Sequence, residues 1–192
     1  MSIEVKRMVK VNVNTVQVGD IIKVKLTDGV KMQAMAMQQE EDGMIFCMVD
    51  CLPGEYPMNS TRTNEGGYEE SVLRKKLNGE ILTLFPVELT DVMTPFENGD
   101  FLRIPTEREI FGENRYGEYE SPNVKQWRLM KKRRNRMAFD GTKDGHLQWY
   151  WLMNKLRESA TGFSGVSCNG RADGNSASSS FGVRPVFKIK NL

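Results

Sequence analysis

The amino-acid sequence predicts an α+β fold built on antiparallel sheets. Three observations carry this prediction: apolar and polar residues alternate near the start, two short stretches in the middle have helical spacing, and an apolar segment follows a polar tract near the end. No internal repeat and no linker-like stretch divides the chain, so we expect a single domain over residues 1–192.

An N-terminal β meander is expected over about residues 1–52. Its segments alternate between apolar and polar side chains, as half-buried strands do. The pair Asp28-Gly29 supplies the positive φ angles that a tight hairpin turn needs, and residues 41–43 form a second turn. The expected strands span residues 3–13, 21–26, 31–37 and 44–49.

Two short helices are expected in the middle of the chain. The first spans residues 68–77, after a loop over residues 53–67 that is rich in turn-forming residues. Asn78-Gly79 then has the composition of a helix C-terminus. Thr106 and Glu109 have the spacing of a capping box, which predicts the start of the second helix.

The strongest charge run is Lys131-Lys-Arg-Arg-Asn-Arg136, which follows apolar residues at helical spacing. Such a run can contact phosphates, but nearby acidic residues are expected to balance it and no nucleic-acid motif accompanies it. We therefore expect a solvated or subunit-contacting basic helix over residues 131–136, and nucleic acid is not the expected partner. The nearby acidic residues are Glu107, Glu109, Glu113, Glu118 and Glu120.

The aromatic cluster Trp149-Tyr150-Trp151 precedes the polar tract. Neighbouring side chains on a strand point to opposite faces, so we expect the two tryptophans in the core and Tyr150 on the outside. Arg184 lies inside an apolar segment and is expected to clamp a carboxylate or loop carbonyls, because an unpaired buried charge is costly.

The region from about residue 148 to 190 is expected to display ligand-binding residues. Its Ser, Asn, Gly and Ala tract is bracketed by the aromatic cluster and by an apolar strand, so the tract is held at both ends. A polar loop that is fixed on a rigid scaffold is a common place for binding.

Several short motifs occur in a fixed order along the chain: Val18–Ile22, Ser71–Asn78, Leu102–Glu107, Trp151-Leu152, Gly170, Ala177 and Gly182–Phe187. The most specific of them is the terminal Gly-Val-Arg-Pro strand. In these motifs the chain resembles a family of bacterial and phage proteins with a C-type-lectin-like fold, some of them variable proteins of diversity-generating retroelements. The resemblance covers most of residues 16–190.

The resemblance implies a C-type-lectin-like fold and a non-catalytic ligand-binding surface, with a receptor-binding role in the phage members. The expected partners are proteins or cell-surface glycans, and a homo-oligomer is compatible with this reading. Short polar side chains and one aromatic ring would form the contacts, as they do in antibody loops. The candidate ligand-binding residues are Tyr150, Asn154, Ser167, Asn169, Arg171, Asp173, Asn175, Ser178 and Ser180.

One feature of the residues themselves points to diversification. From Ser159 to Phe187 there is no Lys, Glu, Gln, Met or Trp, although these residues are common elsewhere in the chain. They are the residues that cannot arise when only the adenines of an AAY codon are replaced. The open alternatives are a structural virion or assembly protein, and a nucleic-acid-associated protein that uses the basic helix.

The sequence gives no indication of catalysis, a cofactor or a metal site, so we expect a protein that is not an enzyme. Three cysteines and one histidine do not form a ligand set, and no nucleophile or phosphate-binding motif is present. No apolar run is long enough to cross a membrane, and no secretion signal is visible. The expected location is a phage virion surface for a phage gene, and otherwise the cytoplasm.

Overall fold

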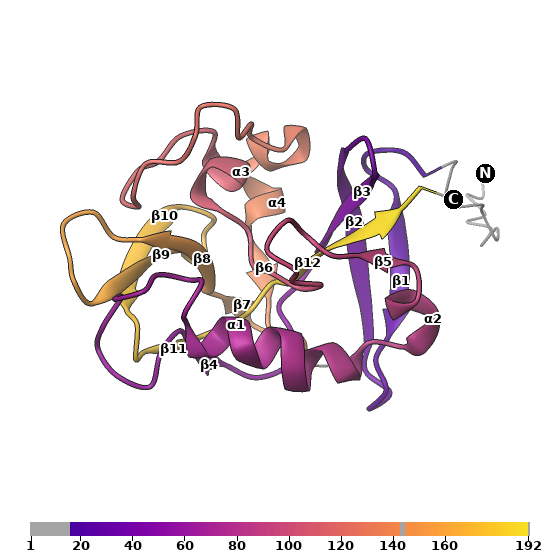
Figure 1. Ribbon diagram of the computed structural model, residues 1–192, viewed down its shortest axis with the longest axis horizontal. Helices are drawn as coiled ribbons and strands as arrows, with labels where there is room; N and C mark the ends of the chain where they lie inside the picture. Colours follow the sequence, from indigo (N-terminus) through magenta and orange to yellow (C-terminus); the bar gives the residue numbers. More distant parts are fainter. Residues whose placement is uncertain (1–15, 143–144, 192) are drawn as a thin grey trace, which may run out of the picture.

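The computed structural model describes residues 16–142 and 145–191 (Figure 1). The first expected strand, over residues 3–13, lies outside the described residues. The next three are present as β1 (Ile21–Lys25), β2 (Lys31–Gln39) and β3 (Gly43–Met48), joined as antiparallel neighbours. Gly29 adopts a φ of 92° in the first turn, which confirms the predicted Asp-Gly hairpin.

These strands belong to a five-stranded sheet with the order β1-β2-β3-β12-β5. The C-terminal strand β12 (Val186–Lys190) lies between β3 and the short strand β5 (Met93–Thr94), antiparallel to both. Strand β3 is buried along its whole length because hydrophobic clusters pack on both of its faces. Strands β3 and β12 therefore form the buried part of this sheet, whereas β1 has exposed side chains on alternate residues.

A second sheet of three antiparallel strands has the order β10-β9-β8 (Figure 1). Its strands are β8 (Tyr150–Lys155), β9 (Gly162–Val166) and β10 (Ala172–Ser176), so that β10 forms an edge. Two small two-stranded sheets complete the β structure. They pair β4 (Tyr56–Pro57) with β11 (Ser180–Phe181), and β6 (Ala138–Phe139) with β7 (Leu147–Gln148).

The first helical segment begins at Val72, four residues after the predicted start at residue 68, because Ser71 caps it, and it extends past the predicted end at residue 77. It begins as α1 (Val72–Lys76), continues through a π-helical turn (Leu77–Ile81) and ends in a 3-10 turn (Leu82–Leu84). The predicted stop at Asn78-Gly79 is wrong. The Asn78 side chain donates to the carbonyls of Arg74 and Leu102 and accepts from the amides of Phe101 and Leu102, so it anchors a neighbouring segment instead.

The remaining helices are short. Helix α2 (Val87–Thr90) follows Pro86, and α3 (Glu107–Phe111) begins with the predicted capping box between Thr106 and Glu109. The expected basic helix over residues 131–136 is wrong as a continuous element. A 3-10 turn (Arg128–Lys131) and α4 (Arg133–Arg136) are separated by an extended residue, Lys132.

Antiparallel sheets with a few short helices make this an α+β protein, as predicted. No helix within residues 16–142 and 145–191 has the length and apolar character needed to cross a membrane.

The position of β8 overturns one expectation about the aromatic cluster. Trp151 packs in one hydrophobic cluster, while Tyr150 and Leu152 pack in the other, so both faces of β8 are covered. Tyr150, expected on the outside, is fully buried. Trp149 is half-buried and stacks on Phe181, with ring centroids 5.6 Å apart.

Candidate ligand-binding surface

Six of the nine candidate residues gather around the edge strand β10. Two lie on the turn before the strand and two on the strand itself, while Ser178 lies on the turn after it and Ser180 begins β11. Five are exposed and Asp173 is half-buried. At about 3.3 Å per residue, β10 separates the two turns by about 13 Å. We call this set the display strip; its members are Asn169, Arg171, Asp173, Asn175, Ser178 and Ser180.

The backbone beneath the display strip is fixed by buried contacts. Ala177 is fully buried; its amide donates to the carbonyl of Thr161 and its own carbonyl accepts from the amide of Asn59. The amide group of Asn64 donates to the carbonyls of Ser159 and Gly162, at 2.6 and 2.9 Å. The predicted attachment of the tract at both ends is confirmed, and anchors inside the tract add to it.

Local hydrogen bonds also order the side chains of the display strip. The Asp173 carboxylate accepts from the amide of Gly174, and the Asn175 side chain accepts from the Ser176 amide and the Ser179 hydroxyl. Side chains that are ordered before binding lose less conformational entropy when a ligand arrives.

Three candidate residues lie in the interior instead. The hydroxyl of Tyr150 donates to the carbonyl of Arg136. Asn154 is 8% exposed; its side chain accepts from the Glu107 amide and donates to the Glu120 carboxylate. Ser167 is 5% exposed, and its hydroxyl donates within the turn that carries Asn169. These three residues hold the scaffold and are not part of the surface.

Arg184 is a buried clamp, as predicted, and it uses carbonyls rather than a carboxylate. Its guanidinium donates to the carbonyls of Met48 and Asn135, at 2.7 and 3.0 Å, and to the hydroxyl of Tyr150 at 3.2 Å. It thereby ties the segment before β12 to β3 and to β8. This arginine is not available to a ligand.

An exposed aromatic loop lies beside the second sheet. Tyr116 and Tyr119 are 53% and 81% exposed, and the Arg157 guanidinium lies 4.4 Å from the centre of the Tyr119 ring. The loop pairs with the end of β8 through Gly117 and Leu156. Tyrosines next to glycine in a polar loop are typical of binding loops, so the composition of this loop could have identified it from the sequence.

A small cavity lies between this aromatic loop and the connection from β8 to β9. Its volume is about 380 Å³. It is lined by Arg115, Tyr116, Leu156, Arg157, Glu158 and Ser159.

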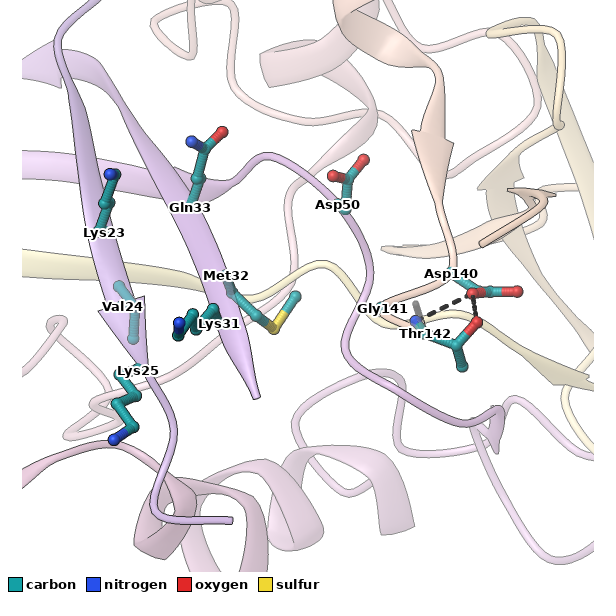
Figure 2. A pocket seen from close by; sticks show the side chains of 10 residues that line it. All are labelled: Lys23, Val24, Lys25, Lys31, Met32, Gln33, Asp50, Asp140, Gly141 and Thr142. Atoms are coloured by element: carbon teal, nitrogen blue, oxygen red, sulfur yellow. Dashed lines mark hydrogen bonds between the residues drawn. The ribbon is translucent and has the colours of Figure 1, made fainter. Parts of the chain in front are cut away.

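A different cavity, of about 520 Å³, opens between the β1–β2 hairpin and the loop after β6 (Figure 2). One wall carries Lys23, Lys25 and Lys31, and the other carries Asp50 and Asp140. A hydrogen bond from the Thr142 hydroxyl, helped by backbone amides, lowers the pKa of Asp140. None of the six display-strip residues lines this cavity.

The buried cysteines do not resemble nucleophiles. Burial raises the pKa of the Cys47 thiol, and it raises the pKa of Cys51 to about 12, so both stay protonated at neutral pH. In the described part of the chain, no group of three or more His, Cys, Asp or Glu side chains is placed to hold a metal ion.

Comparisons with protein-family models, with curated proteins and with solved structures found no match to this chain.

Proposed function

We propose that this protein is a non-catalytic ligand-binding protein whose display strip recognises a partner at a surface. The observation that carries the proposal is the combination of a fixed backbone with outward polar side chains. Ala177 and Asn64 hold the tract to the core. Asn175 and Ser178, which lie on either side of Ala177 in the sequence, point into solvent. A rigid scaffold that presents variable side chains is the physical requirement for recognition without chemistry.

The shape of the display strip favours an extended ligand. The strip follows an edge strand and its two flanking turns, whereas small-molecule sites are concave and enclose most of their ligand. A protein or a cell-surface glycan can contact such a strip along its length. These are the ligand classes that we propose.

We further propose a C-type-lectin-like fold and an origin as a phage-encoded or retroelement-diversified variable protein on a virion surface. The Gly-Val-Arg-Pro segment supports this proposal, because it leads into an interior strand and Arg184 locks it to two other strands. The absence of Lys, Glu, Gln, Met and Trp from residues 159–187 supports diversification.

The first test is to sequence the DNA that flanks the gene. A reverse-transcriptase gene, together with a near-repeat of the region encoding Trp151–Phe187 and mismatches confined to adenines, is the expected result. The mismatches should fall on display-strip codons and spare those of Ala177 and Gly182. A flanking region without a repeat would remove the diversification proposal.

The second test uses stability and needs no ligand. We expect Asn175→Tyr and Ser178→Asp to leave the free energy of unfolding within about 0.5 kcal/mol of the wild type, since surface changes away from buried contacts cost little. The matched control Ala177→Asp introduces a buried charge and should prevent folding or cost several kcal/mol. Strip variants as destabilising as this control would refute the display surface. Loss of a stable oligomer in the strip variants would favour the assembly-protein alternative.

A further inference from the structure

The acidic residues expected to balance the basic run are engaged elsewhere. Glu107 is fully buried and accepts from the amides of Tyr116 and Gly117, and Glu109 forms a two-pronged ion pair with Arg103. The other three pair with neighbours outside the run. Glu113 lies 3.0 Å from Arg115, Glu118 lies 3.1 Å from Lys155, and Glu120 accepts from Asn114, Asn154 and the amide of Arg108.

The lysines and arginines of the basic run are therefore not paired with these carboxylates. Across residues 16–142 and 145–191, none of them lies within ion-pair distance of a carboxylate, and the same holds for Arg171. Burial, and then the positive charges of Arg115 and Arg133, lower the pKa of Arg136. We call these cations the basic surface; they are Lys131, Lys132, Arg133, Arg134, Arg136 and Arg171.

The basic surface is continuous with one end of the display strip. The Arg136 guanidinium donates to the carbonyl of Gly170, at 3.0 Å. A Cβ atom on Gly170 would lie 2.8 Å from the carbonyl oxygen of Arg133, so the backbones of α4 and of the turn are in direct contact. Asn169 and Arg171 flank Gly170, so the two surfaces share Arg171 and meet beside Asn169.

We propose that the basic surface binds an anionic polysaccharide, through sulfate, phosphate or carboxylate groups spaced along its chain. The inference rests on the proposed function, because Arg171 belongs to both surfaces and Asn169 lies where they meet, and it names the chemistry of the ligand at that end. Exposed arginine and lysine attract such groups, and short amide side chains beside them hydrogen-bond sugar hydroxyls.

The structure favours a polysaccharide over a nucleic acid. The segment from Arg128 to Met137 contains no aromatic residue on which a base could stack, and the neighbouring Phe111 ring already contacts the guanidiniums of Arg115 and Arg136, 5.2 and 5.3 Å from the ring centre. Helix α4 has four residues, which is too short to read base edges along a major groove.

The test measures the affinity of fluorescently labelled heparin, a sulfated polysaccharide, by anisotropy over a salt series. Neutral dextran and a DNA duplex of matched charge serve as comparison probes. The test variant is Arg133→Ala/Arg134→Ala, whose side chains are exposed and make no hydrogen bond or ion pair with any described residue. The matched control is Lys25→Ala/Lys31→Ala, which removes the same charge from the β1–β2 hairpin.

We expect heparin to bind, with dextran inactive, and the test variant to weaken binding about tenfold. The slope of log Kd against log salt should fall by about one for each charge removed, hence by about two. The control should change neither quantity beyond about twofold in affinity. Absence of heparin binding, tighter binding of DNA than of heparin, or equal losses in the two double variants would each overturn the proposal.

A third variant separates this inference from the proposed function. Asn169→Ala/Arg171→Ala should also weaken heparin binding, because the two surfaces meet there. If this variant binds as the wild type does while the Arg133/Arg134 variant does not, the basic surface acts alone. That result would refute the proposal that the display strip and the basic surface form one recognition surface, whereas polyanion binding by the basic surface would stand.

Discussion

Asn64 offers the sharpest test of how the display strip is held. This side chain is 7% exposed and donates to the carbonyls of Ser159 and Gly162, where the chain passes from β8 to β9. The carbonyl of Gly162 also accepts from the Leu156 amide, whereas no second donor among the described residues reaches the carbonyl of Ser159. Asn64→Ala therefore removes two hydrogen bonds and leaves one acceptor without a partner.

The expected loss follows from these contacts. Each hydrogen bond contributes about 1 kcal/mol net, and an unsatisfied acceptor adds to the cost, so we expect a decrease of about 2 to 3 kcal/mol in the free energy of unfolding. For a chain of this size that corresponds to a fall of about 5 to 10 °C in Tm. Asn64→Asp should cost more, because a carboxylate would face two carbonyl oxygens.

Urea unfolding measures the global effect, and hydrogen exchange at the Ala177 amide measures the local one. Exchange at this amide should accelerate more than at amides of β3, because the tract loosens before the molecule unfolds. Asn123→Ala is the control: it removes an exposed asparagine whose side chain bonds to no described residue, and it should change stability by less than about 0.5 kcal/mol. A loss for Asn64→Ala as small as the control's would refute the anchoring role.

Three further changes test the scaffold. Tyr150→Phe should cost about 1 to 3 kcal/mol in urea unfolding, because the Arg184 guanidinium loses a buried acceptor, and no loss would mean that this contact is not formed. The hydrogen bond from Lys188 lowers the pKa of Asp42, so the stability advantage over Asp42→Asn should be complete at neutral pH and vanish as pH falls through the folded-state pKa. Melting both proteins from about pH 7 to about pH 2 checks this, and a gap that persists in acid would contradict it. Gly170→Ala places a Cβ atom against backbone at a φ of 73° and should cost about 1 to 3 kcal/mol by thermal melting, whereas a neutral result would argue against this close contact.

Short-range patterns predicted the parts of the fold that depend on neighbours in sequence. The Asp28-Gly29 turn and the capping box of Thr106 and Glu109 each satisfy their own backbone requirements within four residues, so the sequence alone suffices. The pattern failed at Asn78. Its side chain accepts hydrogen bonds from amides 23 and 24 residues away, and the helical segment continues past it.

Tyr150 shows why the candidate site could be only partly predicted. Strand alternation correctly separates Tyr150 from its tryptophan neighbours, but it cannot say whether the opposite face meets solvent. That face is covered by a second hydrophobic cluster contributed by Trp127 and Met130, which come from a distant part of the chain. The exposed positions of the edge strand β10 have no such cover, so there the polar composition was a sufficient guide.

The basic run and the polar tract look unrelated in the sequence because 34 residues separate Arg136 from Gly170. The two segments lie in backbone contact because Gly170 has no Cβ atom. If both proposals hold, one part of the joined surface varies between copies and the other part does not. Adenine replacement confined to the region encoding Trp151–Phe187 would alter the display strip but leave Lys131–Arg136 unchanged. Every copy would then keep the five cations of this run, which attract polyanions and supply affinity, while the strip, Arg171 included, would decide which surface is recognised.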